Sequence, residues 1–498
     1  PHTPPHIRQK KCNLHPNIRH KKCKESTNTR QKKCNFHHNT RQKKCKKLCY
    51  YPDDVYFCKN EQNANKMYRK LYSDLLQWKA SNSRKPLILQ GARQVGKTWL
   101  MKHFGKSEFK SCVYVNFEKD AWASSLFDMD YDVERILLFL QAHSEVKIEV
   151  GQTLVIFDEV QEVPKGLESL KYFCEDMPQL HVMAAGSLLG IAIHEGVSFP
   201  VGKVDILTLY PMSFSEFLLA LGEKEKVALL ESKRWDVLNI LLPSYEELLR
   251  QYYFVGGMPE AVSSFVAEKN LKKIRQIQQN ILSAYRNDVS KHAPKNDVPR
   301  INMVLDSIPS QLAKENKKFV YGSLKKGARA KEFELAIQWL VDAGIVLKIH
   351  MASKPSIPLK VYEDFGAFKL FLCDCGLLGC LAEAPQALVL TSNDIFKEYK
   401  GAYTESFVAQ QLKCNQNLHI YYWSKSDSKC EIDFLIQSGV RVIPVEVKAE
   451  ENVHSKSLST FCNTLYPGIK GVRLSMKPYV EQSWMQNYPL CSVEYCFD

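Results

Sequence analysis

Short apolar runs alternate with amphipathic stretches through the first part of the chain. Five runs have the length and composition of buried strands, at residues 86–90, 112–117, 153–157, 181–185 and 204–209. Between the second and third runs, residues 132–143 place apolar side chains at helical spacing, and residues 67–78 show the same period before the first run. Strands that alternate with helices in this way predict the α/β class, with a doubly wound parallel sheet.

The pattern changes after the fifth run. Residues 213–295 predict helices with no further strand. Residues 301–352 predict a compact helical unit that ends in a strand, because an amphipathic helix at 330–340 precedes an apolar stretch at 344–349. This order of elements suits a winged helix. The loops of this unit are basic at residues 317–318 and 325–329. These charges either contact DNA or form an ordinary solvated surface.

The last hundred residues predict a small α/β domain. Residues 403–412 have a helical pattern, and residues 420–423 form a strand. Two further strands, at 431–436 and 441–448, are joined by a short turn and so predict a hairpin.

Charged side chains meet on this predicted hairpin. Glu446 and Lys448 are two residues apart and share one face of their strand, while Asp433 lies on the partner strand. Two acids and a lysine in this arrangement can hold Mg²⁺ and orient a water molecule against a phosphodiester. They can also be the cross-strand charge pairs of an edge hairpin, and the spacing leaves both interpretations open.

The first candidate for chemistry lies between the first apolar run and the helix that follows it. Residues 91–98 read GARQVGKT, which fits G-x-x-x-x-G-K-[ST]. The glycines let the backbone curl so that successive N–H groups point inward, where the helix N-terminus adds partial positive charge. Lys97 can reach the β- and γ-phosphates of a nucleotide, and the Thr98 hydroxyl can ligate Mg²⁺. The predicted nucleotide-binding residues of this loop are Gly91, Ala92, Arg93, Gln94, Val95, Gly96, Lys97 and Thr98.

Two acids follow the third apolar run. Asp158, at the tip of this strand beside the phosphate loop, would hold Mg²⁺ directly or through water. Glu159 would polarise the attacking water as a general base. The fourth run ends at Ser187, and in a parallel sheet this tip also faces the nucleotide. Ser187 therefore either contacts the γ-phosphate or the water, or caps a helix.

Composition limits the class of protein. With 498 residues, of which 45% are hydrophobic, the chain is long enough for about two to four domains. It has no apolar run of the length that a membrane span requires, and no signal peptide is visible. Its 16 cysteines are typical of reduced intracellular thiols, so a cytoplasmic protein is expected. Cys373, Cys375 and Cys380 have no matching pair and are predicted to be buried thiols rather than metal ligands.

The net charge of +14 is concentrated in one segment. Residues 1–66 contain 17 Lys and Arg but only 4 Asp and Glu, whereas the remainder contains 51 and 50. Bulk charge therefore gives no argument that the globular part binds DNA.

Residues 7–50 of this segment consist of four copies of an 11-residue unit, and the first copy, at 7–17, reads IRQKKCNLHPN. Each unit has too few apolar residues to bury a face, so we expect a disordered basic tail. Zinc binding through the C-x-x-H spacings of Cys12 with His15 and Cys34 with His37 is an alternative, as is contact with a polyanion. The first methionine is Met67, and we expect the natural protein to begin there.

From Met67 onward the chain resembles the prokaryotic AAA-type ATPases that carry a C-terminal domain of unknown function with a restriction-endonuclease-like fold. The motifs of this likeness occur in the family's order. They are GARQVGKT at 91–98, FDEVQEVP at 157–164, AAGSLLG at 184–190, LYPMSFSEFL at 209–218, GGMPEAV at 256–262, ESFVAQQL at 405–412, EIDFLI at 431–436 and VEVKA at 445–449.

The resemblance implies roles for particular residues. The nucleotide-site residues are Lys97, Thr98, Asp158 and Glu159, with Ser187 as the sensor of the γ-phosphate. The nuclease-like signature falls on Glu405, Asp433, Glu446 and Lys448. Many relatives have Gly-Arg before the fifth strand, where this chain has Gly202-Lys203. Because a lysine cannot give bidentate phosphate contact, no arginine finger is assigned there.

The expected division of the chain follows from these patterns. It consists of a disordered basic tail at 1–66, a P-loop ATPase domain at 67–225, a helical lid at 226–295, a winged-helix-like domain at 296–352, a connector at 353–398 and a nuclease-like domain at 399–498. ATP and Mg²⁺ are the expected cofactors, and ATP binding would order the lid against the sheet. The resulting cycle would drive DNA binding or processing through the nuclease-like domain. Alternatively, the chain is a nucleotide-dependent switch or scaffold whose inactive nuclease-like domain binds DNA or a protein partner.

Overall fold

The computed structural model describes most of the chain after residue 66. The described residues are 67–194, 199–314, 317–386, 390, 397–425, 430–449 and 454–497. The chain divides into two units, Pro1–Cys58 and Lys59–Asp498, and only the second contains described residues. The predicted basic tail, with its repeats and its C-x-x-H spacings, lies outside the described residues.

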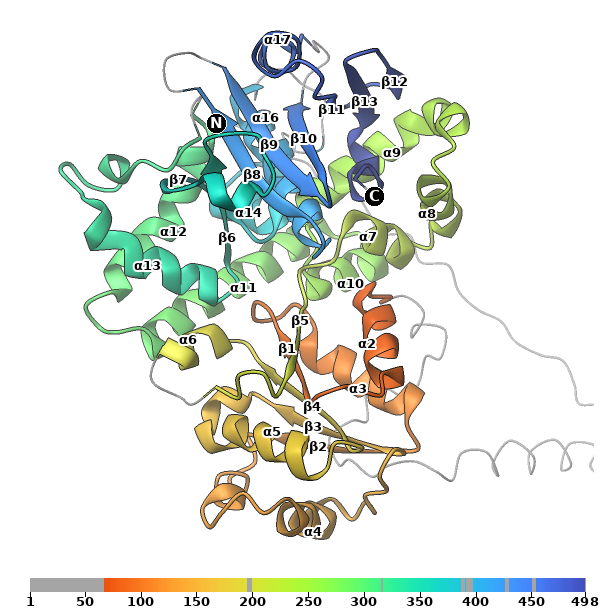
Figure 1. The fold of residues 1–498 in the computed structure, drawn as a ribbon, viewed down its shortest axis with the longest axis vertical. Helices are drawn as coiled ribbons and strands as arrows, with labels where there is room; N and C mark the ends of the chain where they lie inside the picture. The colour runs from red at the N-terminus through yellow and green to blue at the C-terminus, as the bar shows by residue number, and fades with distance from the viewer. Residues whose placement is uncertain are drawn as a thin grey trace, which may run out of the picture. The chain divides into compact units, whose positions relative to one another are not determined.

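A five-stranded parallel sheet forms the core of the first part of the described chain (Figure 1). The strands are β1 Leu87–Gln90, β2 Ser111–Asn116, β3 Thr153–Asp158, β4 His181–Gly186 and β5 Asp205–Thr208. Their order in the sheet is β2-β3-β4-β1-β5, and every neighbouring pair is parallel. All five predicted strands are therefore confirmed. Because β1 lies inside the sheet, the loop after it is flanked by the ends of β4 and β5.

Helices cover both faces of this sheet. They are α2 Leu71–Ala80, α3 Lys97–Glu108, α4 Val133–Ser144, α5 Pro164–Asp176 and α6 Leu189–His194, with short 3-10 turns η2 Ser125–Phe127 and η3 Val160–Glu162. Successive side chains of β3 alternate between two cores. Leu154 and Ile156 pack in the core that contains the apolar side of α3, whereas Val155 and Phe157 pack with α4 and α5. Each such buried side chain contributes about 1.5–3 kcal/mol, so both faces hold their helices and the predicted doubly wound arrangement is confirmed.

Five helices follow β5 without an intervening strand, as predicted. They are α7 Phe214–Leu221, α8 Lys224–Glu231, α9 Trp235–Val255, α10 Pro259–Glu268 and α11 Leu271–His292. A capping box formed by Ser213 and Glu216 begins α7. The apolar sides of these helices belong to the same core as one face of the parallel sheet, so they pack directly on it. No helix in the described part of the chain is long and apolar enough to cross a membrane.

Two helices and a hairpin come next. They are α12 Val298–Leu312, α13 Ala330–Asp342, β6 Val346–Ala352 and β7 Glu363–Leu372, with 3-10 turns η4 Tyr321–Ser323 and η5 Leu359–Tyr362. The helix and strand predicted at 330–349 are confirmed, and β6 pairs with β7 in antiparallel fashion. The stretch predicted as a connector, residues 353–398, nevertheless contains β7 and the helix α14 Cys375–Leu381. Sequence analysis missed β7 because Lys369 interrupts its apolar pattern. Cys373, Cys375 and Cys380 are buried free thiols, as predicted.

The hairpin β6–β7 continues into a mixed eight-stranded sheet of the order β12-β13-β11-β10-β9-β8-β6-β7 (Figure 1). The remaining elements are α16 Lys397–Lys413, β8 His419–Ser424, β9 Glu431–Ser438, β10 Arg441–Lys448, α17 Lys456–Thr460, the short π-helix η7 Phe461–Leu465, β11 Gly471–Ser475, β12 Val480–Glu481, β13 Met485–Pro489 and the 3-10 helix η8 Leu490–Tyr495. The predicted β9–β10 hairpin is confirmed. The strands after residue 448 were not predicted, because they are short and carry no charged motif.

Candidate functional site

The loop between β1 and α3 has a backbone that favours glycine at both ends. Gly91 has a φ of 143° and Gly96 a φ of 96°. A Cβ atom on Gly91 would lie 2.1 Å from the carbonyl oxygen of Leu209, so the loop approaches the end of β5 only because no side chain is present. Gly96 directly precedes α3, and this places Lys97 and Thr98 in the first turn of the helix.

Lys97 lies across this loop and is 7% exposed. Its Nζ donates hydrogen bonds to the carbonyl oxygens of Gly91 at 2.8 Å and Ala92 at 2.9 Å. Burial lowers the pKa of Lys97 to about 8, although the charges of Glu159 and Asp158 act in the opposite direction. A lysine that is held by neutral oxygens can exchange them for the oxygens of an anion without breaking an ion pair.

Two other elements hold the outer side of the loop. From the segment before α2, Arg69 donates to the carbonyl oxygen of Val95 at 2.7 Å. From α11, the Tyr285 hydroxyl donates to the carbonyl oxygen of Arg93 at 3.1 Å, and Asp288 forms an ion pair with the Arg93 guanidinium. The predicted lid helix therefore contacts the phosphate loop directly.

Asp158 ends β3 beside the first turn of α3 and is 1% exposed. Its Oδ2 accepts a hydrogen bond from the Thr98 hydroxyl at 2.7 Å and from the Tyr114 hydroxyl at 2.9 Å. The backbone N–H of Glu159 donates to its Oδ1 at 3.1 Å. Burial raises the pKa of Asp158, and these hydrogen bonds act against that increase. The pairing of a carboxylate with a threonine hydroxyl provides the oxygen ligands that Mg²⁺ prefers, so the residues present fit this ion.

Glu159 follows in a left-handed conformation, with a φ of 53°. Its Oε2 accepts from Gln161 Nε2 at 2.8 Å and from the Ser187 hydroxyl at 3.2 Å. A non-glycine residue in this region of φ carries strain that the surrounding structure must support, and such strain is common at functional sites. The tips of β3 and β4 thus bring Glu159 and Ser187 together. The hydrogen bond from the Ser187 hydroxyl places Ser187 beside Glu159, the predicted general base. This position agrees with the first of the two roles predicted for Ser187, a contact with the γ-phosphate or the water.

Lys203, at the position where many relatives have arginine, forms an ion pair with Glu175 of α5 at 2.8 Å, and both side chains are substantially exposed. This contact gives Lys203 a partner on the surface of the sheet domain.

The turn between α13 and β6 packs against the phosphate loop. A Cβ atom on Gly344 would lie 2.9 Å from the Ala92 nitrogen, and one on Gly190 would lie 2.8 Å from the Asp342 carbonyl oxygen. A cavity of about 280 Å³ lies beside this contact, and its lining includes Ser187 and Lys413. The end of α13 and the end of α16 therefore meet the tips of the parallel strands.

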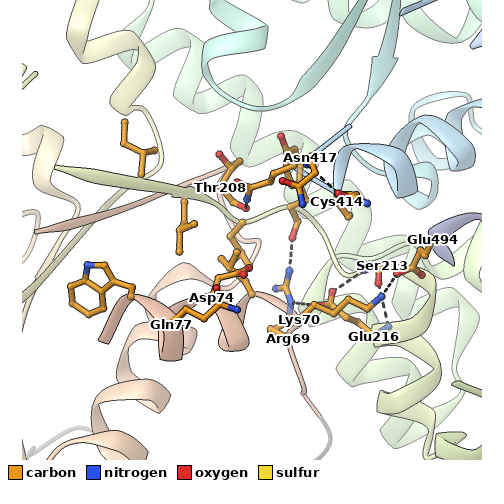
Figure 2. A pocket seen from close by; sticks show the side chains of 18 of the residues that line it. Arg69, Lys70, Asp74, Gln77, Thr208, Ser213, Glu216, Cys414, Asn417 and Glu494 are labelled. Atoms are coloured by element: carbon orange, nitrogen blue, oxygen red, sulfur yellow. Dashed lines mark hydrogen bonds and ion pairs between the residues drawn. The ribbon is translucent and has the colours of Figure 1, made fainter. Parts of the chain in front are cut away.

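A larger cavity, of about 680 Å³, is lined in part by Arg69, the residue that also contacts the phosphate loop (Figure 2). It is lined by α2, β5, the start of α7 and the C-terminal turn, and no residue of the loop 91–98 contributes to it. Within it, Arg69 pairs with Glu216 at 3.2 Å and Lys70 pairs with Glu494 at 2.7 Å (Figure 2). This cavity is larger than the cavity beside the phosphate loop, but the predicted nucleotide-binding residues do not line it.

The predicted nuclease-like residues gather at the β9–β10 hairpin. The pairing of Val445 with Phe434, continued by one residue, places Glu446 opposite Asp433. Asp433 accepts a hydrogen bond from the Val447 N–H at 2.8 Å. We call Glu405 of α16, Glu431 and Asp433 of β9, and Glu446 of β10 the carboxylate cluster.

Three lysines neutralise the carboxylate cluster. Lys448 Nζ lies 2.8 Å from Glu446 Oε1, as the strand period predicted. Lys369 of β7 is 0% exposed, and its Nζ lies 2.5 Å from Glu431 Oε1 and 3.9 Å from Glu405 Oε2. Lys317, in the loop after α12, forms an ion pair with Glu405 Oε1.

The surroundings of two acids in the cluster shift their pKa values in opposite directions. Burial disfavours ionisation of Glu405, yet Lys317 and Lys369 hold the pKa of Glu405 below its usual range. Burial and the charge of Glu405 raise the pKa of Asp433 to about 7. Among the described residues, no three His, Cys, Asp or Glu side chains are arranged to hold a metal ion. The cluster in this arrangement therefore does not fit the predicted Mg²⁺, because lysines take the place of a cation.

Three family matches cover separate parts of the chain. Residues 83–218 match the AAA domain family, residues 246–388 match a domain of unknown function (DUF8612), and residues 400–493 match a second domain of unknown function (DUF4143). The first match includes the phosphate loop, Asp158, Glu159 and Ser187. This part of the chain is therefore similar to AAA domains and contains their phosphate loop. Neither of the other two matches assigns chemistry to the carboxylate cluster.

Several solved structures are similar to the chain. The Walker-type ATPase PABY2304 of Pyrococcus abyssi shares 13% identity, covers 64% of this chain and 96% of its own, and has a TM-score of 0.41. The Aeropyrum pernix Orc1 protein in complex with DNA shares 15% identity over 70% and 98% of the two chains, with a TM-score of 0.26. The RuvB Holliday junction branch migration motor of Thermotoga maritima shares 13% identity over 59% and 91%, with a TM-score of 0.28. No curated protein matches the chain.

Several residues of both sites were missed in the sequence. Tyr114 and Gln161 contact the acids of the nucleotide site, but a tyrosine in a strand and a glutamine in a turn carry no distinctive pattern. Lys369 was detectable in principle, because a lysine within an apolar strand is buried only when it is paired. Lys317 and Tyr285 lie on other elements, and only the fold brings them to their sites.

Proposed function

We propose that the chain binds ATP together with Mg²⁺ at the loop 91–98 and hydrolyses the terminal phosphate. The observation that carries this proposal is the contact between Thr98 and Asp158, with Glu159 next to it, at the tips of two parallel strands. A bound Mg²⁺ would neutralise charge between the β- and γ-phosphates, and Thr98 and Asp158 would hold it.

The other residues have distinct tasks in this proposal. Lys97 releases the carbonyl oxygens of Gly91 and Ala92 and donates to phosphate oxygens instead. Glu159 accepts a proton from the attacking water and orients that water in line with the γ-phosphate. The Ser187 hydroxyl donates a hydrogen bond to Glu159 and so holds this carboxylate in position. Ser187 is therefore a positioning residue in the absence of nucleotide, and the γ-phosphate of bound ATP would offer its hydroxyl a second acceptor.

The contacts of α11 support a conformational cycle. Arg93 belongs to the loop that binds phosphate, and its partner Asp288 belongs to the predicted lid. A shift of the loop on nucleotide binding would change this ion pair and the nearby bond from Tyr285. The lid would close on ATP and relax after hydrolysis.

Phosphate release from ATP by the purified full chain tests this proposal. We expect turnover with Mg²⁺ and none with excess EDTA. A Thr98→Val variant, which keeps the shape but removes the hydroxyl, should need a higher Mg²⁺ concentration for half-maximal rate. The matched control is Thr208→Val, because Thr208 lies at the end of β5 and contacts Gln90 rather than Asp158. Turnover that persists in EDTA would contradict the role of Mg²⁺.

We further propose that the C-terminal domain has a restriction-endonuclease-like fold, with Glu405, Asp433, Glu446 and Lys448 as its site, and that the ATPase cycle acts on DNA through it. This second candidate is favoured by the ion pair of Lys448 with Glu446 at 2.8 Å. Burial lowers the pKa of Lys448, but the charges of Glu446, Asp433 and Glu405 raise it above its usual value. The competing possibility is a nucleotide-dependent switch whose C-terminal domain binds DNA or a protein without cutting.

Incubation of plasmid DNA with the full chain separates these possibilities. Cleavage that depends on Mg²⁺ or Mn²⁺ and disappears in Asp433→Ala, while ATP turnover persists, would support the nuclease. Binding of DNA without cleavage would support the switch.

A further inference from the structure

The cavity of about 280 Å³ beside the phosphate loop is lined by the ends of β1, β4 and β5. Its lining includes Gly91, which begins the phosphate loop, and Ser187, whose hydroxyl donates to Glu159. The cavity is therefore separated from the proposed general base by one side chain. It is also lined by a residue of the C-terminal part of the chain, Lys413, which ends α16.

Lys413 lies at this cavity without a partner for its charge. The residue is half-buried, and burial lowers the pKa of its ammonium group without an opposing effect from a neighbouring charge. Among the described residues, none forms an ion pair or a hydrogen bond with the Lys413 side chain. A cation that is partly removed from water without a partner costs stability. Lys413 therefore has the capacity to bind an anion that the fold itself does not use.

A second lysine lines the same cavity, but its charge is already engaged. Lys348 of β6 is also half-buried, and burial lowers its pKa. Its Nζ lies 4.4 Å from the centroid of the Phe368 ring, and the charges of Glu334 and Glu363 act against the lowering of its pKa. The two lysines are thus alike in burial and differ in whether the ammonium group has partners.

We propose that Lys413 binds a phosphoryl oxyanion in this cavity, either the γ-phosphate of bound ATP or the phosphate released from it. This inference rests on the proposed ATPase function. The cavity lining contains two lysines and one acid, Asp342, whose carboxylate already accepts from Gln338 at 2.8 Å. The balance of charge therefore favours an anion. The Ser187 hydroxyl in the same lining provides a neutral donor beside the charged one.

The position of Lys413 would connect the nucleotide to the C-terminal part of the chain. The end of α16 lies near β5, where Gln416 Nε2 donates to the carbonyl oxygen of Thr208 at 3.4 Å. The same helix carries Glu405 of the carboxylate cluster. An anion that binds both Lys413 and Ser187 would fix the end of this helix against β4. The arrangement of α16 would then differ between the state with the anion and the state without it.

Nucleotide affinity of Lys413→Met tests the first source of the anion, with a non-hydrolysable ATP analogue, ADP and the full chain. We expect Lys413→Met to weaken binding of the analogue about tenfold and to leave ADP binding unchanged, because ADP has no γ-phosphate. Lys413→Arg, which keeps the charge, should recover part of the loss. The matched control is Lys348→Met, which should leave both affinities unchanged because the Lys348 ammonium group lies over Phe368.

Inhibition of ATP turnover by inorganic phosphate tests the second source. If Lys413 holds the released phosphate, the inhibition constant of phosphate should rise about tenfold in Lys413→Met, while the affinity for the analogue stays unchanged. A loss of affinity for the analogue assigns the anion to the γ-phosphate, and a change in phosphate inhibition alone assigns it to the released phosphate. Both outcomes support the site.

Thermal melting without ligand separates binding from a structural role. Lys413→Met should melt at the same temperature as the unaltered chain or at a higher one, because it removes an unpaired charge. A lower melting temperature, together with equal losses of analogue and ADP affinity, would show that Lys413 supports the fold and would overturn the proposal. If Lys413→Met does not fold, Lys413→Gln replaces it in all measurements.

Two further results would overturn the role of Lys413 and leave the proposed ATPase function standing. In the first, the unaltered chain hydrolyses ATP, and Lys413→Met equals it in the binding of the analogue and ADP and in phosphate inhibition. In the second, Lys348→Met has the same effect as Lys413→Met, so that the charge of the cavity matters and not a contact of Lys413. Failure of the unaltered chain to bind ATP would instead remove the proposed function, and this inference with it.

Discussion

The nucleotide site and the carboxylate cluster both combine lysines with buried acids, but they satisfy these charges in opposite ways. In the nucleotide site, Lys97 contacts carbonyl oxygens, while Asp158 and Glu159 accept from hydroxyl, amide and backbone donors. In the carboxylate cluster, Lys317, Lys369 and Lys448 all contact carboxylates.

This difference in partners determines which contacts a ligand must replace at the nucleotide site and at the carboxylate cluster. A phosphate and a cation can replace neutral hydrogen bonds at the nucleotide site, where each exchanged bond has a net worth of about 0.5–1.5 kcal/mol. A cation that approaches the carboxylate cluster must first break an ion pair, and removing one partner of a buried pair costs about 3–5 kcal/mol. The nucleotide site can therefore exchange neutral hydrogen bonds for ligand contacts, whereas a cation at the carboxylate cluster would have to displace a lysine.

The largest effect on ATP affinity is expected at Lys97. Lys97→Ala should weaken ATP binding by roughly 10- to 100-fold, since hydrogen bonds from a charged group are worth about 1.5–3 kcal/mol. Titration with a fluorescent ATP analogue measures the loss. Lys106→Ala, which removes an exposed lysine from the same helix, is the matched control. Wild-type affinity in Lys97→Ala would mean that the loop does not hold the phosphates.

A second prediction concerns the contact between the phosphate loop and the α13–β6 turn. Gly344→Ala should weaken ATP binding by about tenfold, because the new Cβ would lie 2.9 Å from the Ala92 nitrogen and shift the loop. Gly327→Ala is a matched control, since Gly327 also has a positive φ but has nothing within 4 Å of the added atom. Equal affinity in the two variants would show that the turn does not support the loop.

The residues of the two sites differ in how far the sequence could predict them. The phosphate loop binds through contiguous residues, and the acids at the tip of β3 follow an apolar run, so local patterns identify all of them. Asp433, Glu446 and Lys448 were predictable because a hairpin fixes its own register. Lys317 and Lys369 pair with Glu405 and Glu431 from other elements, and the contact of Gly344 with Ala92 joins segments far apart in the chain. No local pattern encodes such contacts.

A third, smaller effect is expected for the link between the loop and the lid. In a double-mutant cycle, Arg93→Met and Asp288→Asn should show a coupling of about 0.5–1 kcal/mol in urea unfolding, because the Arg93 side chain is about one-third exposed. The coupling should change when ATP is present if the lid responds to nucleotide. Strict additivity with and without ATP would remove this ion pair from the proposed cycle.

The smallest effect concerns Glu494, whose carboxylate has both a lysine partner and neutral hydrogen-bond donors. Its carboxylate accepts hydrogen bonds from the Ser215 N–H and the Ser215 hydroxyl, each at 2.8 Å. It also forms an ion pair with Lys70 (Figure 2). Burial disfavours its charge, but Lys70 and Ser215 hold the pKa of Glu494 below the usual value of 4.5. Its stabilising effect is thus present above pH 4.5 and lost as the pH falls through the lowered pKa.

Glu494→Gln should therefore lower the melting temperature at pH 7 by roughly 2–4 °C for each kcal/mol lost, and the difference from the unaltered chain should narrow as the pH falls below 4.5. Melting curves at about pH 7 and about pH 4 measure this. A difference that is constant with pH would mean that the charge of Glu494 does not stabilise the fold.

The role of Glu159 tests the central claim most directly, because in the proposed mechanism ATP hydrolysis depends on this residue whereas ATP binding does not. With Mg²⁺, Glu159→Gln should bind ATP as tightly as the unaltered chain and release phosphate about 10²- to 10⁴-fold more slowly. Both quantities can be measured on the same preparation, by nucleotide titration and by single-turnover phosphate release. A Glu159→Gln variant that hydrolyses ATP at the unaltered rate would contradict the account.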